Sequence, residues 1–289
     1  MITLFTDSDC DMTPELCAKY GYKLISMPYS VDGKLIRPYE DFETFDSHAY
    51  YEMLRGGVLP TTSAVSTETY IQYFEPEFKA GKDILYVHFS AAMTNSFEFM
   101  AQAKEILKEK YPERTLYEID TMGITIVSRA IAEDVGEMFR AGKSVEEILA
   151  WAKPAVEKRA TYFTVDNLKF FHRSGRVSGL SATMGTLLGI RPIISMNAEG
   201  KMAATGQKEK GRKNALRRIV EIMKEIGEDV TQHRIIVGHS DNQEMADEVT
   251  AMIKEAFGEC EIEYSIVNPT AGAHCGPDGL GVTFNAVRR

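Results

Sequence analysis

The stretch Ile84-Leu85-Tyr86-Val87-His88-Phe89, followed at once by Ser90-Ala91-Ala92-Met93-Thr94-Asn95-Ser96, decides the fold of this chain. Its first part is an apolar run of strand length, its second part is a hydroxyl-rich turn, and Phe99, Ala103 and Leu107 then recur at helical spacing. A buried strand, a polar turn and an amphipathic helix make one βα unit. The stretch therefore predicts an α/β domain with a mainly parallel sheet.

The rest of the first half repeats this alternation. Further strands are predicted over residues 2–6, 23–27 and 115–120. Further helices are predicted around Ile71, Phe74 and Phe78, over 124–140, and from a capping box at Ser144 and Glu147 to about residue 158.

The second half has a different character, so we place a domain boundary after residue 158. Two apolar runs flank the turn Asn197-Ala198-Glu199-Gly200, which indicates a hairpin. The remaining predicted elements are strands over 160–165, 234–238 and 262–267 and helices over 212–226 and 242–257. The sequence predicts an α/β protein with an N-terminal mainly parallel-sheet domain (1–158) and a smaller C-terminal α+β domain (159–289), with the ligand between them.

Composition excludes several classes of function. The 289 residues carry a net charge of −9, which argues against a nucleic-acid partner. No stretch approaches the roughly 20 apolar residues of a membrane span, so no integral membrane association is expected. The start Met1-Ile2-Thr3-Leu4-Phe5-Thr6-Asp7 lacks the charged residues of a secretory signal, so we expect a cytoplasmic protein. The four cysteines lack the spacing of a metal site or a disulfide framework, and no metal is expected.

Two hydroxyl-rich turns, Leu59–Ser63 and Phe89–Ser96, each lead into a predicted helix. Backbone N–H groups at a helix start, with hydroxyls beside them, can bind a small anion such as a carboxylate. Ordinary helix capping explains part of each turn, by Ser66 in the first and by Asn95 with Glu98 in the second. Asp7 and Ser8, which follow the first strand, are candidates for the rim of the same site.

The segment Thr270–Gly281 is rich in glycine and contains His274, and we interpret it as a loop. Such a loop can hold the histidine near a ligand, although a plain structural turn remains an alternative. Two basic segments, Arg173–Gly179 and Lys208–Lys213, could face an anionic ligand or simply be solvated. The neighbouring His239, Ser240 and Asp241 have the residue types of a catalytic triad, but adjacent side chains rarely reach its geometry.

Taken in order, these pieces resemble the DegV family of bacterial fatty-acid-binding proteins. The resemblance covers essentially the whole chain, and the motifs that carry it are Thr6-Asp7-Ser8, Thr62-Ser63-Ala64-Val65-Ser66, Ser90 to Ser96, Asp120-Thr121, Ser174-Gly175-Arg176 and His274-x-Gly276-Pro277. The resemblance implies a two-domain α/β protein with a lipid buried between the domains. Members bind one long-chain fatty acid, and some present its carboxylate to a separate fatty-acid kinase that makes an acyl phosphate.

Carried over by motif, Thr62 and Thr94 would hydrogen-bond the fatty-acid carboxylate with His274 nearby, and Ser63 and Asn95 belong to the same two turns. The resemblance further implies that Arg176 and Arg212 serve the kinase encounter or the acyl-phosphate state. The chain departs from the usual family pattern at Ala64-Val65, where Gln-Pro is common, and at Asp278, which replaces a usual glycine.

The resulting hypothesis is a fatty-acid-binding protein without a cofactor or catalysis of its own, which presents its ligand to a fatty-acid kinase. The alternative is a hydrolase or acyl transferase that uses Ser63 or Ser90 with His274. A third possibility is a lipid-responsive regulator. Candidates for the lining of the acyl pocket are Met93, Met184, Leu187 and Leu188.

Overall fold

The computed structural model describes residues 1–179 and 189–289. Its N-terminal part is built on a four-stranded sheet in the order β2-β1-β6-β7, with every neighbouring pair parallel. The strands are β1 (Ile2–Asp7), β2 (Tyr22–Ile25), β6 (Asp83–His88) and β7 (Leu116–Asp120). The parallel α/β architecture predicted for this half is confirmed.

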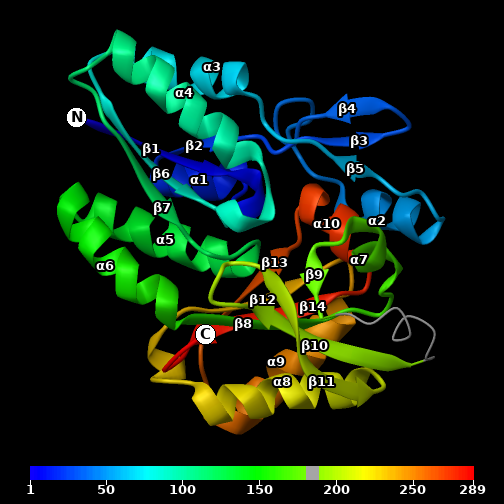
Figure 1. Cartoon of the computed structure of the whole chain (residues 1–289). Helices are drawn as coiled ribbons and strands as arrows, with labels where there is room; N and C mark the ends of the chain where they lie inside the picture. The colour runs from blue at the N-terminus through cyan, green and yellow to red at the C-terminus, as the bar shows by residue number, and fades with distance from the viewer. Residues whose placement is uncertain (180–188) are drawn as a thin grey trace.

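Helices cover both faces of the four-stranded sheet (Figure 1). The helices on one face are α3 (Thr67–Lys79) and α4 (Ser96–Lys110), and those on the other are α1 (Pro14–Tyr20), α5 (Ile126–Arg140) and α6 (Val145–Lys158). Aromatic side chains fill the core between the sheet and α3, where Phe5 and Phe74 meet edge to face with centroids 5.4 Å apart.

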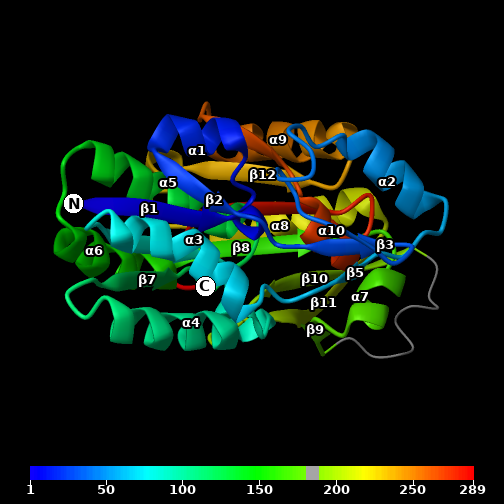
Figure 2. The ribbon, with the colours of Figure 1, turned by 90° about the horizontal axis from the view of Figure 1, so that it is seen from above.

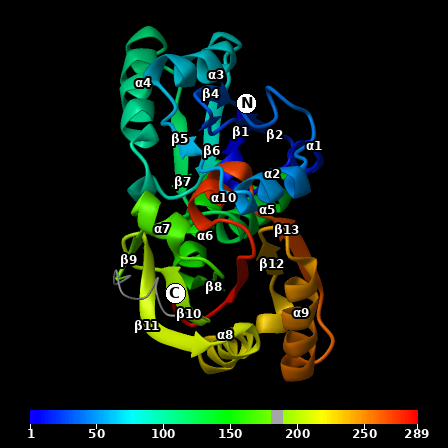
Figure 3. The same cartoon turned by 90° about the vertical axis from the view of Figure 1, so that its right-hand side faces the viewer.

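The second half forms a seven-stranded mixed sheet in the order β13-β12-β14-β8-β10-β11-β9. Its strands are β8 (Arg159–Thr164), β9 (Val177–Ser178), β10 (Ile190–Met196), β11 (Met202–Lys210), β12 (Ile235–His239), β13 (Ile262–Ile266) and β14 (Leu280–Asn285). The helices α8 (Arg212–Ile226) and α9 (Gln243–Phe257) cover its outer face (Figure 3). The predicted hairpin is confirmed, since β10 and β11 pair antiparallel around residues 197–201. With this second sheet, the predicted fold class is confirmed.

Helix α5 lies between the two sheets (Figures 1 and 3). It contacts β6 of the first sheet and β8, β12 and β14 of the second, so most of its surface is buried. Its buried Arg129 pairs with Glu133 at 2.6 Å, which keeps both charges satisfied inside the protein. The chain passes into the second sheet directly after α6, where β8 begins at Arg159. The domain boundary after residue 158 remains a prediction.

A small antiparallel sheet in the order β4-β3-β5 was not expected from the sequence. Its strands are β3 (Tyr29–Val31), β4 (Lys34–Ile36) and β5 (Thr61–Thr62), and the helix α2 (Ser47–Arg55) lies in the excursion between β4 and β5. Strands of two or three residues are too short to show a hydrophobic period. The sheet matters because β3 and β5 lie beside α10 (Pro269–Cys275), as Figure 2 shows.

The loop predicted over 270–281 is wrong, because the structure has the helix α10 there, followed by β14. Asn268 caps this helix by accepting a hydrogen bond from Ala271 N, and Pro269 occupies its first turn. Gly272 is needed for close packing, since a Cβ there would lie 2.7 Å from the Tyr51 hydroxyl. The glycines of this segment thus reflect packing rather than an open loop. No helix formed by residues 1–179 and 189–289 is both long and apolar enough to cross a membrane.

Candidate functional site

A polar groove lies where the parallel strands β1 and β6 end. Thr62, Ser63, Thr94, Asn95 and His274, which the sequence grouped as carboxylate-binding residues, all line it. Arg176 lines the groove as well. Side chains from the loops after β1 and β6, from β5 and from α10 thus converge, as expected at the carboxyl edge of a parallel sheet.

The central contact of the groove joins Thr62 to His274. Thr62 Oγ1 lies 3.0 Å from His274 Nε2, although the two residues are 212 positions apart in the chain. Strand β5 holds Thr62 by pairing with Tyr29 of β3. Arg173 fixes the two sides relative to one another, because its guanidinium donates to the carbonyls of Pro60 at 2.5 Å and Ala273 at 3.2 Å.

His274 is held as a neutral imidazole. Burial, and after it the positive charges of Arg176 and Arg173, lower its pKa to about 4. Its Nδ1 is buried and has no hydrogen-bond partner among residues 1–179 and 189–289. A neutral ring has one N–H donor, so His274 Nε2 can either donate to Thr62 or accept from it. When His274 donates, the Thr62 hydroxyl keeps its own proton free for a ligand.

The second hydroxyl turn is tied to the first. Thr94 Oγ1 accepts a hydrogen bond from Ser96 N at 3.1 Å, and Ser96 Oγ accepts one from Val65 N at 3.1 Å. The capping role predicted for Asn95 is wrong, because Asn95 makes no capping bond and already has helical backbone angles. The role predicted for Ser66 is confirmed, since its hydroxyl accepts from Thr69 N.

An apolar cavity adjoins this groove. The cavity and the groove share Met93, Ile124, Met202 and His274 as lining residues. The cavity is narrow, with a volume of about 70 Å³. Most of its walls are apolar side chains or glycines, including Ile126, Phe163, Val165, Phe171, Met196 and Leu280. Met93 lines it as predicted, whereas Met184, Leu187 and Leu188 lie outside the described residues.

The structure does not bring Arg212 to the groove. This residue begins α8 and pairs with Glu244 at 3.2 Å and Glu248 at 3.4 Å on α9. The two serines of the enzymatic alternative do not contact His274 either. Ser90 Oγ accepts from Ala92 N, and in the described part of the chain His274 has Thr62 as its side-chain partner. A serine nucleophile with an oriented base is therefore not assembled here.

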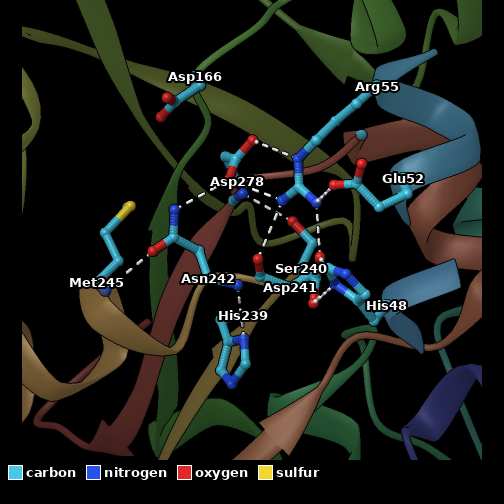
Figure 4. Close-up of polar contacts among 12 residues, drawn as sticks. His48, Glu52, Arg55, Asp166, His239, Ser240, Asp241, Asn242, Met245 and Asp278 are labelled. Carbon is cyan, nitrogen blue, oxygen red and sulfur yellow. Dashed lines mark hydrogen bonds and ion pairs between the residues drawn. The ribbon is translucent and has the colours of Figure 1, made fainter. Parts of the chain in front are cut away.

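The triad-like residues after β12 point to separate partners (Figure 4). His239 Nδ1 accepts from Asn242 N, and Ser240 Oγ accepts from Gly279 N at 2.7 Å. Asp241 faces Arg55 of α2, whose guanidinium donates to it at 2.6 Å. The expectation that this tripeptide is not a triad is confirmed.

Arg55 forms the hub of an ion-pair network that ties α2 to the second sheet (Figure 4). Besides Asp241, it contacts both carboxylate oxygens of Asp278, at 2.9 and 3.2 Å. His48, Glu52 and Asp241 bring ligand atoms within 4.8 Å of one another. The Arg55 guanidinium already donates hydrogen bonds to two of the three, Glu52 and Asp241. Its positive charge balances these carboxylates, as a metal ion would otherwise do.

Three residues of the site were not singled out from the sequence. Asp9 and Lys201 line the groove. Arg173 positions Thr62 and His274 through hydrogen bonds to the carbonyls of Pro60 and Ala273. Arg173 lies in a basic segment that the sequence did highlight, but its three carbonyl contacts depend on packing between distant segments.

Comparison with known proteins gives a consistent result over the full length of the chain. The profile described as "uncharacterised protein, DegV family" matches residues 1–287. A DegV domain-containing protein of Clostridium perfringens is 30% identical over 285 residues, which cover 97% of this chain and 96% of that protein.

Solved structures of the same fold include two that are described as fatty-acid-binding proteins. A stearic-acid-binding protein from Eubacterium ventriosum superposes with a TM-score of 0.86 at 20% identity, covering 99% of this chain and 98% of that one. DegV of Bacillus subtilis, described as a fatty acid binding protein, superposes with a TM-score of 0.82 at 23% identity, covering 99% of both chains. With its profile match, its full-length relatives and this shared fold, the chain belongs to the DegV family.

Proposed function

We propose that this protein binds one long-chain fatty acid, with the carboxylate in the polar groove and the acyl chain in the narrow apolar cavity. The observation that carries the proposal is that the two spaces adjoin, since they share four lining residues, one of which is His274 of the Thr62–His274 pair. A buried carboxylate needs several donors. The Thr62 and Thr94 hydroxyls supply two of them, and the single N–H of His274 donates to Thr62, which leaves the Thr62 proton for the ligand. The fatty-acid-binding relatives of the same fold support this assignment.

The two parts of the site contribute differently to binding. Each buried CH₂ stabilises the complex by about 0.8 kcal/mol, so a long acyl chain gives on the order of 10 kcal/mol before the cost of association. The groove orients the ligand, because its hydrogen-bond donors bind only the carboxylate end. Affinity should therefore rise with chain length until the cavity is full.

Denaturing mass spectrometry of the purified protein tests this function. We expect a fatty acid to co-purify with the chain. We also expect the delipidated protein to bind hexadecanoic acid more tightly than hexadecane, which lacks the carboxylate. A protein that carries no lipid and binds no fatty acid on titration would refute the proposal.

We further propose that the bound carboxylate is presented to a separate fatty-acid kinase, which converts it to an acyl phosphate. The exposed Arg176 and the groove residue Lys201 support this, since two cations at the mouth of the groove suit a phosphate that forms there. Arg212 lies outside the groove, partly exposed, and its proposed role is contact with the kinase alone.

Incubation of the loaded protein with ATP and a fatty-acid kinase tests this step. We expect acyl phosphate only when both proteins are present, and a loss of turnover without a loss of fatty-acid affinity in Arg212→Glu. Turnover by the isolated chain would contradict a purely presenting role.

A further inference from the structure

Asp9 occupies an unusual position in the polar groove. It lies in the turn after β1, is only 4% exposed, and lines the same groove as Thr62, Thr94 and His274. Its Oδ1 atom is buried without a hydrogen-bond partner among residues 1–179 and 189–289. A buried carboxyl oxygen without a donor is costly, so such a group in a ligand site calls for a partner that the described part of the chain does not provide.

The two neighbouring aspartates show what a satisfied carboxyl looks like in this turn. Asp7 accepts hydrogen bonds from Cys10 N, Phe89 N and the Tyr86 hydroxyl. Asp11 accepts from the backbone and side-chain amides of Asn268 and from the Ser265 hydroxyl. Both therefore have structural roles that bind the turn to its surroundings. Of the three, Asp9 lines the groove, and its Oδ1 has no donor among residues 1–179 and 189–289.

The surroundings of Asp9 favour its neutral form. Burial raises its pKa well above the ordinary value, and the nearby carboxyls of Asp7 and Asp11 raise it further. A neutral carboxylic acid has one O–H donor, which an ionised carboxylate lacks. The other titratable or charged groups that line the groove are Glu98, Arg176, Lys201 and His274, and the hydroxyl of Thr270 on α10 faces Asp9.

We propose that Asp9 is a further ligand-binding residue, which donates its carboxylic O–H to the carboxylate of the bound fatty acid. The inference rests on the proposed function, because it takes the ligand head group to be a carboxylate. The two carboxyl groups share one proton, as carboxyl pairs do when both cannot ionise in one site. The pairing gives the buried Asp9 carboxyl a hydrogen-bond partner and leaves one negative charge instead of two on the Asp9 and fatty-acid carboxyl groups.

The sign of the pH dependence follows from this arrangement. When the pH rises through the pKa of Asp9 in the free protein, the donor is lost and the ionised Asp9 repels the ligand carboxylate. The affinity for a fatty acid should then fall, approaching tenfold for each further pH unit because one proton is bound per ligand. His274, whose pKa is about 4, stays neutral throughout this range.

Titration of hexadecanoic acid into delipidated protein between pH 6 and pH 10 tests the inference. Asp9→Asn keeps the shape and an N–H donor but cannot ionise, so it should bind within about threefold of wild type at pH 6 and lose affinity far less than wild type as the pH rises. Asp9→Ala should bind about 10- to 100-fold more weakly at pH 6, the usual range for a hydrogen bond to a charged group. Asp32→Asn is the matched control, since it makes the same exchange at an exposed carboxylate that does not line the groove, and it should retain the wild-type profile.

Infrared difference spectra with carboxyl-labelled hexadecanoic acid report the shared proton directly and do not depend on a change in affinity. In the wild-type complex we expect the isotope-shifted carboxylate band of the ligand beside the unshifted band of a protonated carboxylic acid from Asp9, and the loss of the unshifted band in Asp9→Asn. Identical affinities and pH profiles for wild type, Asp9→Asn and Asp9→Ala would overturn the inference and leave the proposed function standing. Tighter binding of hexadecylamine than of hexadecanoic acid would also overturn it, since Asp9 would then act as an acceptor. A wild-type protein that binds no fatty acid at any pH would overturn the proposed function itself.

Discussion

Replacing Thr62 by valine removes one hydroxyl from the centre of the proposed site and little else. Valine keeps the β-branched shape that suits strand β5, so the backbone pairing with Tyr29 should persist. The change deletes the 3.0 Å contact to His274 and a donor to the ligand carboxylate. A hydrogen bond to a charged group contributes about 1.5–3 kcal/mol, so we expect fatty-acid affinity to fall about 10- to 150-fold.

The neighbouring Thr61→Val provides the control, because Thr61 is exposed on the same strand and does not line the groove. Calorimetric titration of both delipidated variants with hexadecanoic acid measures the difference. Thermal unfolding of the free proteins should show a cost of about 1 kcal/mol at most for Thr62→Val, the usual size of one neutral hydrogen bond. Equal affinities for wild type and Thr62→Val, or equal losses in the two variants, would refute the assignment of Thr62 to the carboxylate.

Further predictions concern the stability of the elements around the site. The pKa of His274 is about 4 in the folded protein, against 6.5 ordinarily, so as the pH falls the unfolded chain takes up this proton before the folded protein does. The free energy of unfolding should therefore drop by about 3 kcal/mol between pH 7 and pH 4. In denaturant unfolding, His274→Gln should remove this part of the pH dependence. Arg55→Met leaves the carboxylates of Asp241 and Asp278 without their shared partner and should lower the free energy of unfolding by about 1–2 kcal/mol in chemical denaturation. In the same assay, Glu52→Gln should change it by under about 0.5 kcal/mol, because Glu52 is a mostly exposed partner of Arg55. Gly272→Ala places a Cβ 2.7 Å from the Tyr51 hydroxyl and should cost about 1–3 kcal/mol; in a double-mutant cycle, the cost should be smaller in a Tyr51→Phe background.

The sequence predicted the elements whose signal is local. The apolar run at 84–89 and the helical spacing after it form β6 and α4, and the capping box at Ser144 is present. Each of these signals depends on residues that are close together in the sequence. The helix α10 was missed although Asn268 and Pro269 carry a standard start signal, because its glycines were interpreted as turn residues.

Contacts between distant segments could not be derived in the same way. The pairing of Thr62 with His274 depends on a two-residue strand and a seven-residue helix that meet only after folding, and the motif resemblance placed them together without showing their contact. Asp9 carried no signal at all, because an aspartate after a strand more often caps a turn. Its distinguishing property is a buried oxygen with no donor in the described part of the chain, and this property exists only in three dimensions.

A crystal structure of the complex with hexadecanoic acid would show directly where each end of the ligand binds. We expect carboxylate oxygens within hydrogen-bond distance of Thr62 Oγ1 and Thr94 Oγ1, and an acyl chain that passes Met93 and Ile124 into the cavity between α5 and the second sheet. A carboxylate bound away from these hydroxyls, or a chain that lies outside the cavity, would contradict this expectation.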